Sequence, residues 1–222
     1  MVISYYGLSC FEIQSGGTSL VFDLPARNAS HSDAGGPSKK SAVKSPRFQA
    51  DIFVQSHDHD GHNGVESITR EKEFFLVDSP GEYEIKGIYI RGMKSFHDSV
   101  SGKKHGTNTV YMVRCENVKL CFMGDFGEKE IKPELKEEIG EIDVLFVPIG
   151  GETVLDAEGA RKAINQIEPT IAIPMHYPNN GKALKSFLAE MGQKDVKPLE
   201  KFSIKKKDIT ENGTQIVILS VV

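Results

Sequence analysis

Cysteine is scarce in this sequence of 222 residues, and the few cysteines lie far apart. Cys10, Cys115 and Cys121 are odd in number and form no Cys-x-x-Cys pair. This pattern argues against a disulfide framework and against a thiolate zinc knuckle. We therefore expect three buried thiols on strands.

Long apolar runs are also missing. No segment approaches the ~20 apolar residues that a membrane-spanning helix needs, and residues 1–6 lack the basic leader of a secretory signal. Hydrophobic residues make up 39% of the chain and charged residues 26%. This composition favours a single globular domain over residues 1–222, and we expect it to be cytoplasmic.

A basic surplus is absent as well, because the formal net charge is −4. Nucleic-acid-binding proteins normally concentrate positive charge on one face, so the overall charge does not favour such a partner. One local exception is the segment 25–49, where Asp33 is the only acidic residue among Arg27, Lys39, Lys40, Lys44 and Arg47. This long polar segment predicts a flexible basic loop, which is either a lid that attracts an anionic substrate or a solvated loop without a ligand.

Strand and helix patterns alternate along most of the chain. A hairpin of segments 3–13 and 18–22 is expected first, and further strands are expected at 51–55, 74–77, 81–85, 88–93, 109–114, 118–123, 143–148, 170–174, 202–206 and 215–222. Helices are expected at about 64–72, 128–139, 156–167 and 180–191. The unbroken apolar run 143–148 is typical of a strand covered on both faces. The order predicts an α/β sandwich of sheets covered by helices.

The most informative feature is a cluster of histidines directly after the apolar strand 51–55. It contains His57, His59 and His62. Neutral imidazole binds zinc, iron and related divalent ions, and α/β sheets tend to place sites at the carboxyl ends of strands. Three histidines within six positions at a strand end are therefore hard to explain as ordinary surface or core residues.

Three further candidates follow predicted strands, namely His97, Asp125 and His176. Each alone is weak evidence, since a single histidine or a turn aspartate is common, but their joint placement at strand ends favours a metal site. His57 and His59 could chelate one ion with His97 as the third ligand, and His62, Asp125 and His176 could hold a second, with Asp125 bridging. His31 and His105 lie in polar segments and are expected to face solvent.

This set resembles the metallo-β-lactamase superfamily, whose first motif reads His-x-His-x-Asp-His. More narrowly, the chain resembles small metal-dependent hydrolases related to bacterial lactonases of the ascorbate-phosphate type. The supporting phrases are Tyr6-Gly7-Leu8-Ser9-Cys10-Phe11, Gly81-Glu82-Tyr83-Glu84, Gly124-Asp125, Pro148-Ile149-Gly150-Gly151 and Ile173-Pro174-Met175-His176-Tyr177. The resemblance implies an αββα sandwich of two mixed sheets, with the metal site at one edge. It also implies His57, His59 and His97 on one metal, His62 and His176 on the other, and Asp125 between them.

One position departs from the motif, because Gly61 stands where the family has a metal-binding aspartate. Asp60, one residue earlier, or Asp58 is a candidate for partial compensation, so Asp60 and Asp125 are the candidate catalytic residues. Adjacent side chains on an extended loop point in different directions, and full substitution would require a rerouted loop. Three alternatives follow: a two-metal site with a weakened second ion, a one-metal hydrolase, or a binding protein without strong catalysis.

The predicted function is hydrolysis of a small, anionic ester, lactone or phosphoester by metal-activated water. One or two divalent ions are expected, zinc first, with manganese or iron as alternatives. A metal-dependent nuclease or phosphodiesterase is a second hypothesis, although the chain is short for the clamp domain of such nucleases. A catalytically weakened metal- or ligand-binding protein is the third, because of Gly61. The expected partner is a small molecule, with nucleic acid as the alternative and no membrane; the sequence predicts no oligomeric state.

Overall fold

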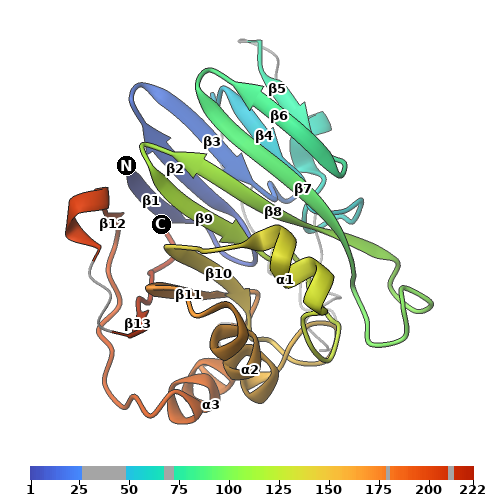
Figure 1. The fold of residues 1–222 in the computed structure, drawn as a ribbon, viewed down its shortest axis with the longest axis vertical. Helices are drawn as coiled ribbons and strands as arrows, with labels where there is room; N and C mark the ends of the chain where they lie inside the picture. The colour runs from blue at the N-terminus through green and yellow to red at the C-terminus, as the bar shows by residue number, and fades with distance from the viewer. Residues whose placement is uncertain (27–48, 68–72, 179–180, 210–212) are drawn as a thin grey trace.

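The computed structural model describes residues 1–26, 49–67, 73–178, 181–209 and 213–222. Its strands form two mixed sheets of six and seven strands. Figure 1 shows the sheets stacked as two layers, with the helices α2 (Ala157–Ile167) and α3 (Lys182–Glu190) beside the strands β10 (Val144–Pro148) and β11 (Ile171–Met175). This arrangement confirms the predicted sandwich of two sheets with helices outside them.

The first sheet is largely built from the N-terminal part of the chain. In spatial order it contains β12 (Phe202–Ser203), β1 (Val2–Tyr5), β2 (Phe11–Ser15), β3 (Thr18–Phe22), β4 (Ile52–Val54) and β5 (Phe75–Val77). Strands β1, β2 and β3 are antiparallel neighbours, whereas β4 runs parallel to β3 and to β5. The carboxyl ends of β3 and β4 therefore meet at the same edge.

The second sheet contains β13 (Gln215–Ile216), β11 (Ile171–Met175), β10 (Val144–Pro148), β9 (Val118–Phe122), β8 (Thr107–Cys115), β7 (Ile88–Phe96) and β6 (Gly81–Ile85) in spatial order. Strands β9, β10 and β11 are parallel, and β7 runs in the same direction because β8 is antiparallel to both β7 and β9. The ends of β7, β9 and β11 therefore point to one edge.

Aromatic side chains fill the space between the two sheets. Phe22 of β3 stacks on Phe122 of β9 with ring centroids 4.4 Å apart, and Phe11 of β2 contacts Phe146 of β10 at 4.7 Å. All four rings are fully buried. The alternation of strand side chains sends Val21 to the opposite, outer face, where it joins a separate small apolar cluster.

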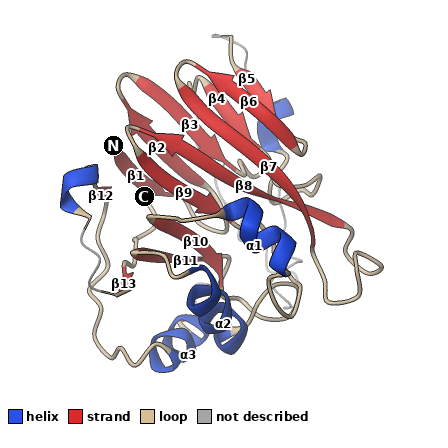
Figure 2. Cartoon of the chain, viewed as in Figure 1, coloured by secondary structure: helices blue, strands red, loops and turns tan. Residues whose placement is uncertain are grey.

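The α-helices lie outside the sandwich on the side of the second sheet (Figure 2). The α-helices α1 (Pro133–Ile139), α2 (Ala157–Ile167) and α3 (Lys182–Glu190) follow strands of the second sheet, and η3 (Lys206–Asp208) is a short 3₁₀-helix. A further 3₁₀-helix, η2 (Gly64–Ser67), places Val65 in the small cluster on the outer face of the first sheet. Asp156 begins α2 as a cap, since its carboxylate accepts the N–H of Gly159 at 2.8 Å.

Several element boundaries differ from the predictions. The expected strand 3–13 is split into β1 and β2 by a turn in which the N–H of Cys10 donates to the carbonyl of Gly7. The expected helix 128–139 begins only at Pro133, and Pro is favoured at the first helical position because it lacks an N–H. Strand β7 runs three residues further than expected, to Phe96, which brings its end directly to His97.

The remaining predictions concern the cysteines, the apolar strand 143–148 and the basic segment 25–49. All three cysteines are buried and free, as predicted. Cys115 and Cys121 lie on strands as expected, but Cys10 lies in the turn just before β2. Both faces of β10 are buried. Most of the basic segment 25–49, including Arg27 to Arg47, lies outside the described residues, as do His31 and the predicted helix end at 68–72. No helix among the described residues combines the length and apolar character needed to cross a bilayer.

Candidate metal centre

Strand ends from both sheets bring the predicted metal-site residues together. His57, His59 and His62 follow β4, His97 follows β7, Asp125 follows β9 and His176 follows β11. Because these carboxyl ends meet at one edge of the sandwich, residues up to about 120 positions apart in sequence become neighbours.

Asp125 lies at the centre of this cluster, and its Oδ2 atom is surrounded by imidazoles. The Nε2 atoms of His176, His97 and His62 lie 3.1, 3.2 and 3.3 Å from it, and that of His57 lies 3.9 Å away. Asp125 and His62 are almost completely buried. Several imidazole rings therefore converge on one carboxylate oxygen in a space shielded from bulk water.

The donor atoms divide into two groups that share Asp125. The first group consists of His57, His97 and Asp125, and the second of His62, Asp125 and His176; within each group the ligand atoms lie within 4.8 Å of one another. His59 belongs to neither group, although its ring lies 5.7 Å from that of His57 and 6.3 Å from that of His97, measured between centroids. The structure thus places five of the six predicted ligands in two triads and His59 beside the first.

The acidic candidates of the histidine loop lie at its surface. Asp58 and Asp60 are both exposed and belong to neither group. The carboxylate of Asp58 accepts a hydrogen bond from the Asn63 side chain at 2.8 Å, while the main-chain carbonyl of Asp60 accepts the N–H of Ala26 at 2.9 Å. Gly61 between them and His62 is buried.

Asp23 is a buried carboxylate of this centre that the sequence analysis did not single out. It follows β3 and is fully buried. Its Oδ2 contacts Nδ1 of His62 at 2.8 Å and accepts the hydroxyl of Ser56 at 2.7 Å, and its Oδ1 accepts the N–H of Ser56 at 2.7 Å. The available signal was an aspartate at the end of the apolar strand 18–22, the same placement that drew attention to Asp125.

These hydrogen bonds determine which nitrogen each imidazole presents to the centre. His62 donates its Nδ1 proton to Asp23, so Nε2 is the nitrogen that faces Asp125 and that offers a lone pair once His62 loses its second proton. The Ser56 hydroxyl donates to Asp23 and can therefore accept the Nδ1 proton of His57 at 2.9 Å. One carboxylate thus sets the tautomers of two candidate ligands, as outer-shell partners of metal-bound histidines do.

Asp125 is itself held in a fixed orientation. The Ser9 hydroxyl donates to its Oδ1 at 3.4 Å, and its main-chain N–H donates to the side-chain oxygen of Asn108 at 2.9 Å. Asn108 in turn donates to the carbonyl of Met123 and to the hydroxyl of Ser95, both at 2.8 Å. With Oδ1 engaged by Ser9, Oδ2 is directed toward the four imidazoles.

The backbone near His176 is closely packed. His176 has a left-handed conformation with φ of 51°, and its N–H donates to the carbonyl of Leu8 at 2.8 Å. A Cβ atom at Gly150 would lie 2.3 Å from the carbonyl oxygen of His176. The loop after β10 can therefore pass beside His176 only because residue 150 is glycine.

Burial and neighbouring charges shift the pKa values of three groups in the centre. Burial and the adjacent His62 lower the pKa of His57 well below its usual value. Burial also acts to lower the pKa of His62, but the carboxylates of Asp125 and Asp23 outweigh it and raise this pKa well above the usual value. Burial acts to raise the pKa of Asp125, but His176 and His62 outweigh it and hold this pKa well below the usual value. The metal-free centre therefore has an ionised Asp125 beside a protonated His62.

The chemistry of the donor set fits divalent metal ions. The Nε2 atoms of His57, His97 and His176 and the Oδ2 atom of Asp125 are buried without hydrogen-bond partners in the protein. Buried polar atoms without partners are costly, and cations bound by each triad would satisfy them. Imidazole and carboxylate together suit zinc, manganese and iron.

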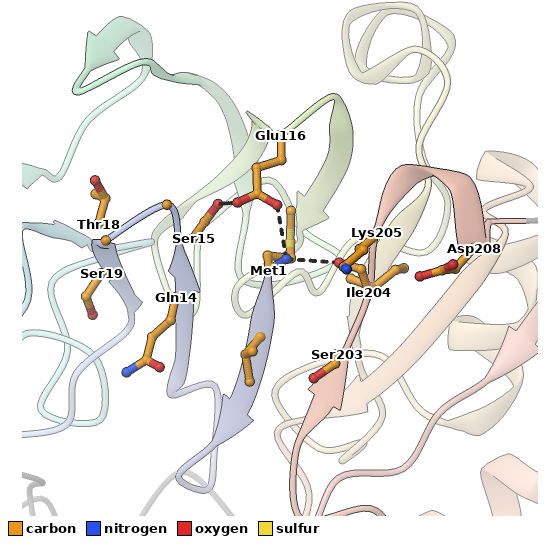
Figure 3. A pocket seen from close by; sticks show the side chains of 13 residues that line it. Met1, Gln14, Ser15, Thr18, Ser19, Glu116, Ser203, Ile204, Lys205 and Asp208 are labelled. Atoms are coloured by element: carbon orange, nitrogen blue, oxygen red, sulfur yellow. Dashed lines mark hydrogen bonds and ion pairs between the residues drawn. The ribbon is translucent and has the colours of Figure 1, made fainter.

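A cavity of about 590 Å³ lies elsewhere and contains none of these residues (Figure 3). The main-chain amine of Met1 in its wall contacts Glu116 at 3.1 Å and donates to the carbonyl of Ile204 at 2.9 Å, and Ser15 also donates to Glu116. Because these wall groups satisfy one another, the cavity lacks the unpaired donor atoms that distinguish the metal centre.

The fold and the donor set define a class, a two-sheet sandwich with a histidine-rich metal centre at its strand ends. A family profile described as a β-lactamase superfamily domain matches residues 2–176. The chain therefore belongs to the β-lactamase superfamily.

Relatives and solved structures agree with this membership. A UPF0173 metal-dependent hydrolase of Listeria welshimeri is 28% identical over 205 residues, which cover 80% of this chain and 85% of the relative. One from Pyrococcus horikoshii is 35% identical over 101 residues, 44% of each chain. A Thermotoga maritima structure assigned as a zinc-dependent hydrolase of the metallo-β-lactamase superfamily is 26% identical, with a TM-score of 0.73 and coverage of 98% of this chain and 97% of that one.

Proposed function

We propose that this protein is a metal-dependent hydrolase that uses metal-activated water to cleave a small, anionic ester, lactone or phosphoester. Superfamily membership and relatives named metal-dependent hydrolases support the hydrolase assignment. The observation that carries the proposal is the convergence of four imidazole nitrogens on one oxygen of Asp125.

In this proposal each metal ion has its own imidazoles. His57, His59 and His97 would hold one ion, His62 and His176 would hold the other, and Asp125 would contribute to both. The proposed metal is zinc, with manganese and iron as alternatives. When bound, such ions lower the pKa of coordinated water toward about 7 and polarise the oxygen of the group under attack.

The protein's own residues prepare this chemistry. Asp23 and Ser56 hold the rings of His62 and His57 with Nε2 inward, and Ser9 orients Asp125. Asp60 is exposed in the histidine loop, and its proposed catalytic role is to contact the substrate or the entering water. We also propose a small-molecule partner and a cytoplasmic location.

Turnover of a chemical panel tests the activity. We expect the metal-loaded protein to hydrolyse at least one of a set of lactones, esters and phosphodiesters. Mutation of a residue that only supports a metal ligand typically lowers activity by about 10- to 100-fold. Because His97 and His59 are proposed as ligands themselves, His97→Ala and His59→Ala should reduce turnover by more than this. Lys119→Gln, on an exposed lysine paired with Glu141, is the matched control and should retain activity. The absence of metal-dependent turnover across the panel would contradict the proposal, and cleavage of labelled single-stranded RNA alone would support a nuclease instead.

Gly61→Asp tests whether the second ion is weakened. The backbone of Gly61 lies outside the left-handed region, and an added Cβ would meet only Leu8, at an ordinary contact distance of 3.8 Å. An aspartate therefore fits, and we expect elemental analysis to show more ions per chain in the variant than in the parent. An unchanged number of ions would argue against the loss of a ligand at this position.

A further inference from the structure

The segment Asp98–Gly106, which connects β7 to β8, is organised around one buried carboxylate. Asp98 is only 6% exposed, and its two oxygens accept main-chain N–H groups at 2.8 to 2.9 Å from Val100, Gly102, Lys104 and His105. Four such bonds to an ionised group hold the loop in one conformation. Burial opposes the charge of Asp98, but these bonds outweigh burial and hold its pKa well below the usual value.

The same loop also contacts His97 and the preceding residue, Phe96. The N–H of His97 donates to the carbonyl of Gly106 at 3.1 Å. Gly102 packs so closely on the ring of Phe96 that a Cβ there would lie 2.8 Å from a ring carbon. The loop and the strand end that carries His97 therefore form one rigid unit, which projects from the end of the second sheet between β7 and β8 (Figure 1).

His105 lies at the accessible end of this unit, beside the metal centre. Its ring centroid is 5.3 Å from that of His97, whose Nε2 lies 3.2 Å from Oδ2 of Asp125. In contrast to His97, His105 is exposed. It belongs to neither triad, so its ring nitrogens are not needed as metal ligands. Because the ring is exposed and lies beside His97, it can contact a molecule bound at the centre.

The exposed charge of the loop is entirely positive. Lys103 and Lys104 are exposed next to His105, while the only acidic residue of the loop, Asp98, is buried and bonded to main-chain N–H groups. The histidine loop after β4, which supplies other imidazoles of the centre, carries the exposed carboxylates of Asp58 and Asp60. The exposed charges of the two loops are therefore opposite in sign, so an anionic group is attracted to the loop with His105 and not to the histidine loop.

We propose that His105 is a substrate-contacting residue that recognises an oxyanion group of the substrate, with Lys103 and Lys104 supplying positive charge and Asp98 acting as its positioning residue. This inference rests on the proposed function, since it assigns the anionic part of the same substrate to the loop Asp98–Gly106 beside the centre. The group recognised is a phosphoryl or carboxylate group, and both present oxygens that accept hydrogen bonds from imidazole and ammonium groups.

Binding of inorganic phosphate and of acetate to the metal-loaded protein tests the inference and separates the two anion types. We expect His105→Ala, which removes the side-chain donor, to weaken binding of the preferred anion by about tenfold, the effect of losing one hydrogen bond to a charged group. Since only the main-chain N–H of His105 bonds to Asp98, this variant keeps the loop intact. His105→Arg should restore binding, and Lys119→Gln is the control at a remote lysine.

Asp98→Asn provides the second arm, because its side chain reaches the anion only through the loop. We expect weaker anion binding and a raised KM with a smaller change in kcat, at an unchanged number of metal ions per chain. Parent-like binding in His105→Ala would overturn the inference, as would the absence of anion binding by the parent protein. Anion binding that is lost in His105→Ala, in a protein without hydrolytic activity, would uphold the inference and contradict the proposed function.

Discussion

At the scale of single residues, the centre depends on one carboxylate behind the imidazoles. Asp23 bonds to His62 directly and reaches His57 through the hydroxyl of Ser56. It lies one residue beyond β3, in a left-handed conformation with φ of 42°. The identity of this residue therefore controls the orientation of ligands in both triads, although its carboxylate belongs to neither.

Replacing Asp23 with asparagine should weaken metal binding without removing any ligand. Oδ2 of Asp23 accepts from both His62 and the Ser56 hydroxyl, and Oδ1 accepts the Ser56 N–H. An amide has one acceptor oxygen, so its NH₂ group must face either the Ser56 N–H or the pair of His62 and the Ser56 hydroxyl, and donor would then face donor. We expect metal affinity to fall by about 10- to 100-fold, measured by competition with a chelating indicator. Asp143→Asn is the control, because Asp143 is also buried but pairs with Lys206. Unaltered affinity in Asp23→Asn would show that Ser56 and His62 orient the ligands without it.

Metal uptake should release a proton from His62 near pH 7. His62 has a raised pKa in the metal-free protein and is protonated there, whereas the lowered pKa values of His57 and Asp125 mean that neither has a proton to lose. The apparent metal affinity should therefore rise as pH increases toward the raised pKa of His62 and fall in acid. Calorimetric titrations in two buffers of different ionisation enthalpy measure this release. Heats that do not depend on the buffer would contradict it, and Asp23→Asn should reduce the release because it removes one of the carboxylates that raise this pKa.

At the scale of elements, the strands determine where the ligands lie and the tight turns determine how they point. Strands β9 and β11 lie on either side of β10. Asp125 lies in the turn after β9, and His176 is the first residue after β11. Gly124 precedes Asp125 with φ of 57°, in a space where a Cβ would lie 2.4 Å from Asn108. Gly150 faces the carbonyl of His176 in a similar way. At Gly124 and Gly150 the neighbouring atoms leave no room for a side chain, so each turn requires glycine in its present backbone position.

Gly150→Ala should disturb the second triad more than the first. The added Cβ would overlap the carbonyl oxygen of His176 at 2.3 Å, so the loop after β10 must move away from the end of β11. We expect a loss of about 1–3 kcal/mol in the free energy of unfolding together with reduced metal content by elemental analysis. Gly16→Ala is the control, because φ is +55° but nothing lies within 4 Å. It should lose about 1–2 kcal/mol and keep the parent's metal content, and equal metal loss in both variants would contradict this account.

At the scale of the whole molecule, the metal centre depends on two sheets that are held together by their aromatic core. The histidine loop belongs to the first sheet, whereas His97, Asp125 and His176 belong to the second. Phe146 of β10 contacts Phe11 and Phe22 of the first sheet at centroid distances of 4.7 and 6.1 Å. Any change in the packing of the sheets would therefore change the distances between ligands.

Phe146→Ala should lower the stability of the metal-free protein substantially. The ring is fully buried, so its removal loses apolar burial and leaves a cavity between the sheets. We expect a decrease of about 3–5 kcal/mol in the free energy of unfolding, measured by urea denaturation. Phe75→Ala, at a ring that is 54% exposed on β5, should change it by no more than about 0.5 kcal/mol. Similar values for the two variants would mean that Phe146 does not join the sheets.

The sequence by itself determined the layered architecture, the candidate ligands and the departure at Gly61. These are local properties, because strand periodicity, the covered strand at 143–148 and the spacing of His57, His59 and His62 can all be read within a few residues. Only the tertiary structure decided that Asp125 is central and that Asp23 sets the tautomers of His57 and His62. It alone brought His105, expected to be merely solvent-facing, beside His97. Those facts depend on contacts between distant segments, such as the 39 positions between Asp23 and His62, and on the direction of individual side-chain atoms, neither of which is encoded in local periodicity.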